Sequence, residues 1–233
     1  WFAGTDKFSC LTVTYEGNGT KENPYEVGDA HQLQCIEEQD LGANYVQVSE
    51  IDASGTSSWD FSRGFDPIGG TFRGTFDGQG YNIMNLTIDR GGEENSNVGL
   101  FDFIGDGSTV TNISVVNADI TGFGEVGGLV GYNDGTISET CVTGSVSGFR
   151  EVGGLVGNNG QGKIERSYAT GAVEASGYQV GGLVGWNAGT VSGSYATGSV
   201  NGSLRVGGLV GINDGVNDEG RVFRSESACR ERV

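Results

Sequence analysis

The sequence predicts an all-β protein, a parallel β-helix (β-solenoid) of roughly six to seven rungs with a short N-terminal helical cap. The first observation is a repeat: the string VGGLVG occurs four times, and a degenerate copy, VGLFDF, precedes them. The second is its spacing, because successive copies begin 28, 26, 28 and 26 residues apart. The third is that no copy offers a helical run of about ten residues. The copies begin at Val98, Val126, Val152, Val180 and Val206.

Each regular repeat holds about three short strands separated by glycine-bearing corners. One variable residue follows VGGLVG, and an asparagine comes next in all four copies. With one repeat per rung, like residues stack into ladders with a spacing of about 4.8 Å. The valine and leucine ladders then fill the core, and the asparagine ladder hydrogen-bonds amide to amide at a corner. The asparagines of this ladder are Asn133, Asn159, Asn187 and Asn213.

The absence or presence of the repeat divides the chain into two segments. Residues 1–45 carry none, and we expect them to form an N-terminal cap segment with a short helix. Asp29 is followed three residues later by Gln32, which is the pattern of a capping box at a helix start. Such a helix covers strand edges that otherwise expose unpaired N–H and C=O groups. Residues 46–233 are predicted to form the solenoid, with regular rungs from about 98 to 228 and an incomplete last rung.

The composition is acidic: 30 Asp and Glu stand against 13 Lys and Arg, a net charge of −17. Nucleic acid and anionic membranes repel such a surface, so neither is expected as a partner. Adaptation to molar salt, divalent cation binding and ordinary solubility all explain the acidity, and the scarcity of Lys favours a halophilic protein. No apolar run of about 18 residues exists, so no membrane span is expected in this chain. Because the chain begins at Trp1 rather than Met, we expect a processed product or a fragment.

The four cysteines fall into two groups. Cys10 and Cys35 both lie in the non-repetitive segment and are a candidate disulfide pair. Cys141 and Cys229 lie about four rungs apart, a separation that is too long for a bridge in a regular stack. Cys141 takes the place of the tyrosine of later repeats, and we expect it to be a small buried hydrophobe. No Cys/His cluster predicts a zinc site.

Candidate glycosylation sites follow the Asn-X-Ser/Thr pattern at four positions. They are compatible with a secreted location, although a chain this rich in Asn, Ser and Thr contains such triplets by chance. The four asparagines are Asn18, Asn85, Asn112 and Asn201.

The repeat VGGLVG-x-N-x-G-T-[IV]-x-x-S-Y-A-T-G-x-V closely resembles the GLUG motif, named for its Gly-Leu-x-Gly core, here Gly128-Leu129-Val130-Gly131. The resemblance covers about residues 98–228. It implies an extracellular β-solenoid, because such repeats are found in secreted and cell-surface proteins, many of them from halophilic archaea, and in parts of bacterial immunoglobulin A peptidases. It implies no catalytic activity. Two departures are the cysteine at position 141 and the decay of the last repeat.

Catalytic chemistry has few candidates in this chain. The single histidine, His31, excludes an H-E-x-x-H metalloprotease, and no G-x-S-x-G elbow is present. Glu125 and Glu151 fall in one column just before VGGLVG, where two carboxylates one rung apart would share a proton or a cation. The Asp-Gly turns at Asp106, Asp134 and Asp214 offer oxygen ligands to calcium, although Asp-Gly is also the ordinary tight turn. The sequence predicts no cofactor, and calcium is the one candidate.

The most variable columns of the repeat are candidate contacts for a partner or a glycan. Tyr132 and Trp186 share one such column, and Arg150 and Tyr178 share another. Exposed aromatic rings at these positions would stack on sugars or pack against a partner, or they would simply cover a corner.

The sequence therefore predicts a non-enzymatic extracellular or cell-surface β-solenoid that serves as a scaffold, adhesion or assembly module, including filament formation. Its expected partners are further copies of itself, other surface proteins and glycans. The alternative is a β-helix lyase or hydrolase acting on surface glycans, which requires a lateral groove with converging carboxylates. The third hypothesis is a calcium-stabilised structural module.

Overall fold

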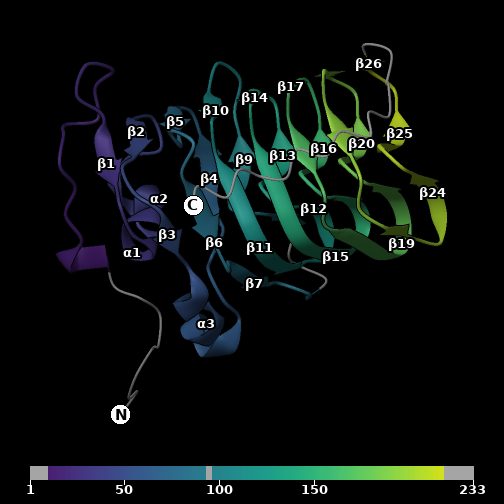
Figure 1. Ribbon diagram of the computed structural model, residues 1–233, viewed down its shortest axis with the longest axis horizontal. Coiled ribbons are helices and arrows are strands. Elements are labelled where there is room, and N and C mark those ends of the chain that lie inside the picture. The colour runs from purple at the N-terminus through teal and green to yellow at the C-terminus, as the bar shows by residue number, and fades with distance from the viewer. Residues whose placement is uncertain (1–9, 93–95, 218–233) are drawn as a thin grey trace.

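The computed structural model describes residues 10–92 and 96–217 as a single parallel β-solenoid (Figure 1). Every pairing between its strands in the described residues is parallel, and after the first turn the chain visits three sheets in the same order in each turn. The third of these sheets has six strands, so the solenoid completes about six turns. The predicted fold class is confirmed, since a repeat of this length can bury its apolar side only against its neighbours.

Sheet A has eight strands and is the first sheet of each turn. Its inward column runs through Val110, Ile137, Ile164 and Val191, which are at most 3% exposed. Its strands are β1 (Tyr25–Val27), β2 (Asn44–Gln47), β5 (Thr75–Asp77), β10 (Thr109–Thr111), β14 (Thr136–Ser138), β17 (Lys163–Glu165), β21 (Thr190–Ser192) and β26 (Val216–Asn217).

Sheet B has 12 strands, because two or three short strands often share one turn. The first valine of each VGGLVG string lies in it, and Val126, Val152 and Val180 pair in register with no exposed area. Its strands are β3 (Ile51–Asp52), β6 (Asn82–Met84), β7 (Thr87–Asp89), β8 (Ser96–Val98), β11 (Ser114–Thr121), β12 (Gly124–Gly127), β15 (Cys141–Gly153), β18 (Tyr168–Ala169), β19 (Ala172–Gly181), β22 (Tyr195–Ala196), β23 (Val200–Asn201) and β24 (Leu204–Gly207).

Sheet C has six strands and carries the second half of each VGGLVG string. Its inward column of Phe101, Val130, Val156 and Val184 is fully buried. Each such side chain contributes about 1.5–3 kcal/mol to the stability of the fold. Its strands are β4 (Ile68–Phe72), β9 (Phe101–Ile104), β13 (Val130–Asn133), β16 (Val156–Asn159), β20 (Val184–Asn187) and β25 (Val210–Asn213).

Short helices replace sheet strands in the first turn. Between β1 and β2 the chain forms α1 (Ala30–Gln34) and α2 (Ile36–Gln39), where later turns have strands of sheets B and C. Asp29 caps α1, since its Oδ1 accepts from the backbone N–H groups of His31 and Gln32, both at 2.8 Å. The Gln32 side chain in turn accepts from the N–H of Gly28 at 2.7 Å, so the predicted helix start is observed with its return bond shifted by one residue.

A second helical insertion lies outside the segment predicted to be helical. It separates β3 from β4 and comprises η2 (Ser54–Ser58) and α3 (Trp59–Ser62). A further short helix, η1 (Cys10–Thr12), carries one end of a disulfide to Cys35, with a Cα–Cα distance of 5.6 Å. The disulfide ties the first described residues to the junction of α1 and α2.

The expectation for Cys141 is wrong. The residue is 3% exposed, as a small buried hydrophobe would be, but its thiol is disulfide-bonded rather than free. The bonding partner lies outside the described residues, as do Cys229 and the predicted decay of the last rung.

Candidate functional site

A lateral hollow of about 600 Å³ opens beside the first complete turns of the solenoid. Its walls come from α2, from α3 and the chain that follows it, from the start of β4, from Arg90 just after β7, and from β8 and β9. The residues that line it are Glu37, Asp60, Arg63, Asp66, Pro67, Gly69, Gly70, Arg90, Ser96, Asn97, Val98 and Asp102.

The hollow exists because the regular corner of the repeat is missing at this turn. Asp102 of β9 stands in register with Gly131 and Gly157 of the next two rungs. A Cβ atom at Gly131 would lie 2.3 Å from the backbone of Asn97, because the corner of the preceding rung closes over that column. In front of β9 the chain instead forms α3 and a bulge between Ile68 and Thr71, so the column has room for a carboxylate.

Arg90 is the most buried charge in the hollow, with 5% of its side chain exposed. Its Nη2 lies 3.1 Å from a carboxylate oxygen of Asp60 and 3.2 Å from one of Asp66. Its Nη1 donates to the backbone carbonyl of Arg63 at 2.7 Å. The planar guanidinium thereby ties the loop after α3 to the end of β7, a geometry that Lys does not reproduce.

Among the groups that line the hollow, Asp102 has the most perturbed pKa. Burial raises its pKa from 3.8 to about 6, the nearby charges of Glu37 and Asp66 add to this, and hydrogen bonds from Asn97 and Gly70 oppose it. Its Oδ1 is buried and has no hydrogen-bond partner among the described residues. Asp102 therefore loses its proton at about pH 6, whereas an ordinary surface carboxylate loses it near pH 4.

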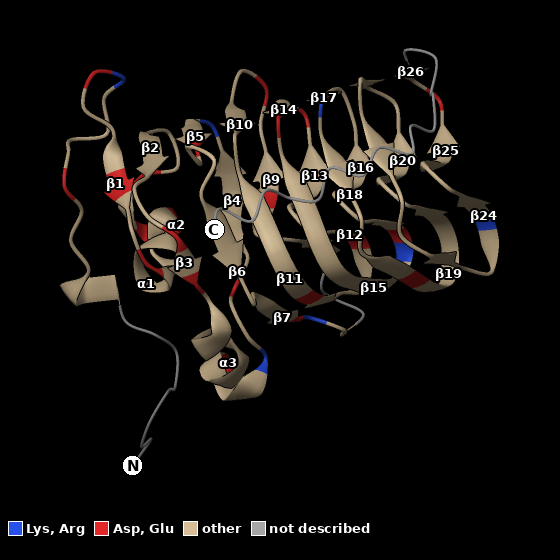
Figure 2. Cartoon of the chain, in the orientation of Figure 1, with Lys and Arg blue, Asp and Glu red and all other residues tan. Residues whose placement is uncertain are grey.

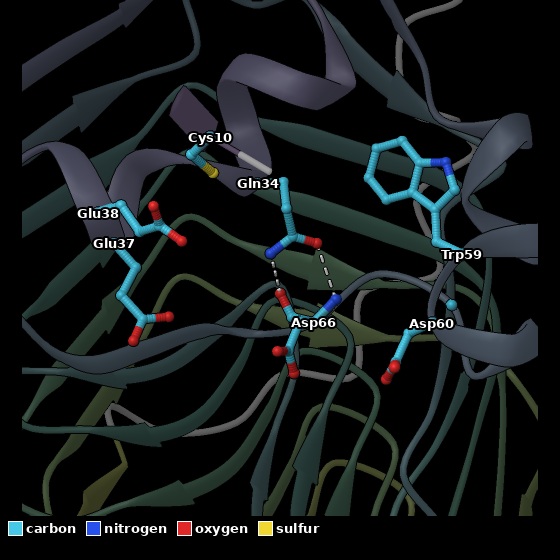
Figure 3. A pocket seen from close by; sticks show the side chains of 8 residues that line it. Cys10, Gln34, Glu37, Glu38, Trp59, Asp60 and Asp66 are labelled. Carbon is cyan, nitrogen blue, oxygen red and sulfur yellow. Dashed lines mark hydrogen bonds between the residues drawn. The ribbon is translucent and has the colours of Figure 1, made fainter. Parts of the chain in front are cut away.

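A smaller pocket adjoins the hollow and shares Glu37, Asp60 and Asp66 with it (Figure 3). The Gln34 carboxamide bridges α1 to this wall, since its Nε2 donates to the carbonyl of Asp66 at 2.8 Å and its Oε1 accepts from the N–H at 2.9 Å. Trp59 stands at the right of this view, across the pocket from Glu37 and Glu38. Its ring stacks on His31 with centroids 5.0 Å apart, so the one histidine packs against an aromatic wall.

The rim of both pockets is a turn of left-handed backbone. Asp60, Phe61 and Ser62 have φ values of 46°, 56° and 67°. Such a conformation costs about 1–2 kcal/mol for each residue other than glycine, and it persists only where other contacts hold it. The Asp60–Arg90 ion pair is one such contact. Phe61, at the tip of the turn, is 67% exposed.

The four predicted ladder asparagines form one continuous chain of amide hydrogen bonds. Nδ2 of Asn133 donates to Oδ1 of Asn159 at 2.8 Å, and Asn159 donates in the same way to Asn187 at 2.6 Å. Asn187 donates to Asn213 at 2.7 Å. The first three have no exposed area, so this ladder supports the fold and is closed to a ligand.

The variable columns are in register but most of their groups have partners within the chain. Tyr132 packs edge-on against Phe103 at 5.0 Å, and Nε1 of Trp186 donates to Oδ2 of Asp214 at 2.9 Å. Arg150 pairs with Tyr178 in the sheet. The four proposed contact residues therefore lie on two different sheets, sheets B and C, and do not converge on one cleft.

The carboxylate column singled out in the sequence does not pair with itself. Glu125 forms an ion pair of 3.3 Å with Arg150. Glu151 instead accepts from Nδ2 of Asn158 at 2.7 Å, and burial raises its pKa. The two carboxylates therefore have different partners within the chain, and a proton or cation shared between them stays a prediction.

Among residues 10–92 and 96–217 the structure places no three or more His, Cys, Asp or Glu side chains in a geometry that would hold a metal ion. In the same part of the chain, no helix has both the length and the apolarity needed to cross a membrane.

The hollow was missed at the sequence level because its residues come from non-repetitive segments. One signal was available: Asp102 interrupts a column in which the following rungs carry glycine. The other members, among them Asp60, Asp66 and Arg90, show no motif, and only the tertiary structure brings them together.

The fold and its ladders define a class, a parallel β-solenoid built from VGGLVG rungs. The family model of the GLUG motif matches residues 150–174 and 176–201. The chain is therefore a GLUG-motif protein.

Two curated proteins are similar in sequence. Halomucin of Haloquadratum walsbyi is 39% identical over 247 residues, which cover 88% of this chain and 3% of halomucin. A protein of Evansella cellulosilytica named "Putative Gly-rich membrane protein" is 36% identical over 135 residues, which cover 54% of this chain and 15% of that protein. The chain thus spans a small fraction of the length of both relatives.

One solved structure shares the fold. It is described as a putative immunoglobulin A1 protease from Bacteroides ovatus, and it superposes with a TM-score of 0.69 at 21% sequence identity. The match covers 86% of this chain and 65% of that one. At this identity the likeness concerns the fold alone.

Proposed function

We propose that this chain is a non-enzymatic, surface-associated scaffold module that assembles end to end by adding the rungs of a second copy. The proposal rests on a difference in burial along the ladder formed by the first valine of each VGGLVG string. Val152 and Val180 have no exposed area, whereas Val206, their equivalent in the last rung that the structure describes, is 45% exposed. Leu204 and Val216 of the same end are 60% and 63% exposed. A further parallel rung would bury these side chains and satisfy the strand edges.

The relatives support a location at the cell surface. One is named a halomucin and the other a membrane protein, and both are much longer than the aligned region. The acidic surface agrees with such a role in strong salt, where screening removes the repulsion between copies that carry −17 charges each.

Sedimentation velocity in molar salt tests the assembly with a matched pair of variants. Val216→Glu puts a charge on the exposed terminal strand, and we expect it to convert oligomers to single chains. Phe61→Glu places the same charge on the lateral α3 turn, away from the terminal rung, where the side chain is 67% exposed, and should leave the distribution unchanged. If the unmodified chain sediments as single chains at all concentrations, the assembly proposal is wrong.

One observation favours the alternative of a glycan-acting enzyme. Asp102, with its pKa of about 6, faces the carboxyl groups of Glu37 and Asp66 in a lateral hollow. An acid of raised pKa beside a second carboxylate is the pairing that glycoside hydrolysis uses. Release of reducing sugar from a set of neutral and acidic polysaccharides tests this candidate. Activity that is lost in Asp102→Asn and kept in Asp106→Asn, an exposed turn carboxylate, would support it; no release from any substrate would reject it.

A further inference from the structure

The structure separates the four Asn-X-Ser/Thr sites into buried and accessible classes. We propose that Asn18 is the acceptor of an N-linked glycan on the folded chain, and that Asn85 and Asn112 are not acceptors. A transferase needs the asparagine Nδ2 free and the triplet extended into its active site. The hydrogen bonds and burial of each triplet therefore decide whether its asparagine can be glycosylated.

Asn85 has both ends of its carboxamide engaged between rungs. Its Nδ2 donates to Oδ1 of Asp52 at 3.2 Å, and its Oδ1 accepts from Nδ2 of Asn117 at 2.8 Å. The middle residue of its triplet, Leu86, has no exposed area. Presenting this triplet to an enzyme therefore requires that Leu86 leave the core.

Asn112 is held in a similar way. Its Nδ2 donates to Oδ1 of Asp77 in the preceding rung at 3.0 Å. The middle residue of its triplet, Ile113, also has no exposed area. Local opening that exposes a core side chain costs a sizeable part of the global stability, so this triplet is rarely accessible in the folded chain.

Asn18 lies in an exposed loop before β1. The middle residue of its triplet is Gly19, with no side chain in the core. The hydroxyl of Thr20, the third residue, donates to Oδ1 of Asn18 at 2.8 Å, and the backbone N–H of Thr20 lies 3.2 Å from the same oxygen. Both bonds use the oxygen of the carboxamide, and the Nδ2 donates to no atom of the described residues.

Asn201 is exposed but lies on strand β23, where it pairs with Glu174 of β19. The hydroxyl of its triplet, on Ser203, donates to the carbonyl of Ser176 at 3.0 Å. An acceptor triplet here must first detach a strand from the sheet. The Asn18 triplet lies outside the strands and is held to β2 only through the Gly19 carbonyl, which accepts from the backbone N–H and from Nδ2 of Asn44, both at 2.9 Å, so Asn18 is the more reactive of the two exposed sites.

The reaction needs an activated sugar, which is a phosphate-linked glycosyl donor carried on a lipid. Nδ2 of Asn18 attacks the anomeric carbon, the new N–C bond forms, and the bond from that carbon to the phosphate oxygen breaks. The phosphate leaves with the bonding electrons, and a base of the transferase takes the proton from Nδ2. The folded chain contributes only the accessible triplet.

The test incubates the folded full-length chain with a purified oligosaccharyltransferase and a lipid-linked oligosaccharide, and it measures occupancy of each asparagine by glycopeptide mass spectrometry. We expect occupancy at Asn18 to exceed that at Asn85 and Asn112 by about tenfold or more. In the reduced and denatured chain we expect the difference to disappear. Thr20→Val should abolish the modification at Asn18 alone, and circular dichroism checks that this exposed change leaves the fold intact.

Two results would overturn the proposal. One is occupancy at Asn85 or Asn112 in the folded chain that equals occupancy at Asn18. The other is a folded chain in which Asn18 stays unmodified. Neither result depends on whether the chain assembles end to end, so the proposed function is tested separately.

Discussion

Arg90 and Asp102 carry opposite charges in the same hollow but have different surroundings. Arg90 has carboxylate and carbonyl acceptors on both terminal nitrogens. Asp102 keeps a buried oxygen without a partner among the described residues, and burial raises its pKa to about 6. A buried cation that is fully paired stabilises the loop that it ties down, whereas a buried carboxylate with an unpaired oxygen costs stability when it ionises.

This difference predicts a pH-dependent stability. Because the pKa of Asp102 is higher in the folded than in the unfolded chain, the folded state binds the proton more tightly. The stabilising contribution of protonated Asp102 to the free energy of unfolding is complete below about pH 4. It is lost as the pH rises through about 6. We expect Asp102→Asn to raise the free energy of unfolding by about 1 kcal/mol at neutral pH and to change it little at about pH 4.

Urea unfolding of both proteins at the two pH values measures the effect. Asp106→Asn, at an exposed turn, is the control and should be neutral at both. A destabilised Asp102→Asn protein at neutral pH would show that the carboxylate makes a favourable contact.

At the scale of elements, the repeat is held in register by two kinds of column, one polar and one without side chains. The asparagine ladder joins β13, β16, β20 and β25 through buried amides. The glycine column in the same strands lets the corner of each preceding rung approach the sheet. Both columns act between rungs, so a single substitution affects its neighbours above and below.

For the polar column, we expect Asn159→Ala to lower the free energy of unfolding by about 2–3 kcal/mol, because it removes two buried amide hydrogen bonds, the one from Nδ2 of Asn133 and the one to Oδ1 of Asn187. Asn213→Ala, at the exposed end of the ladder, should cost about 1 kcal/mol or less. Denaturant unfolding compares the two, and equal losses would contradict a buried network.

For the glycine column, Gly157→Ala places a Cβ atom 2.3 Å from the carbonyl carbon of Glu125. We expect a loss of about 3 kcal/mol or more, because the backbone on both sides is held by strand pairing. Gly55→Ala is the matched control, since no atom lies within 4 Å of its added Cβ. Thermal unfolding that shows the same midpoint for both variants would contradict the close corner.

The ladders were predictable and the hollow was not, for one physical reason. In a solenoid, residues at one position of the repeat become neighbours in space, so the period alone places Asn133 beside Asn159. The hollow instead joins residues such as Asp60, Arg90 and Asp102, whose separation in the chain follows no period. The left-handed turn after Trp59 could not be predicted either, because none of its three residues is a glycine.

At the scale of the whole molecule, the two ends of the described chain differ. The helices α1 and α2 stand at one end, where α2 contacts β4, the edge strand of sheet C (Figure 1). At the other end, β24, β25 and β26 present apolar side chains with no further rung over them in the described part of the chain. Acidic residues are spread over the corners and faces along the stack, and basic ones are few (Figure 2).

Because the exposed apolar side chains lie at one end of the stack, we expect assembly through the terminal rung rather than lateral association. Lateral contacts would bring the acidic faces together, whereas end-to-end addition would bury Val206, Leu204 and Val216 in the register of the repeat.

Electron microscopy of the purified chain in molar salt tests that claim most directly. We predict particles that lengthen along the solenoid axis by whole copies, and shorten to single copies when Val216→Glu is introduced. Uniform single solenoids at every concentration, or particles joined side by side through their acidic faces, would contradict it.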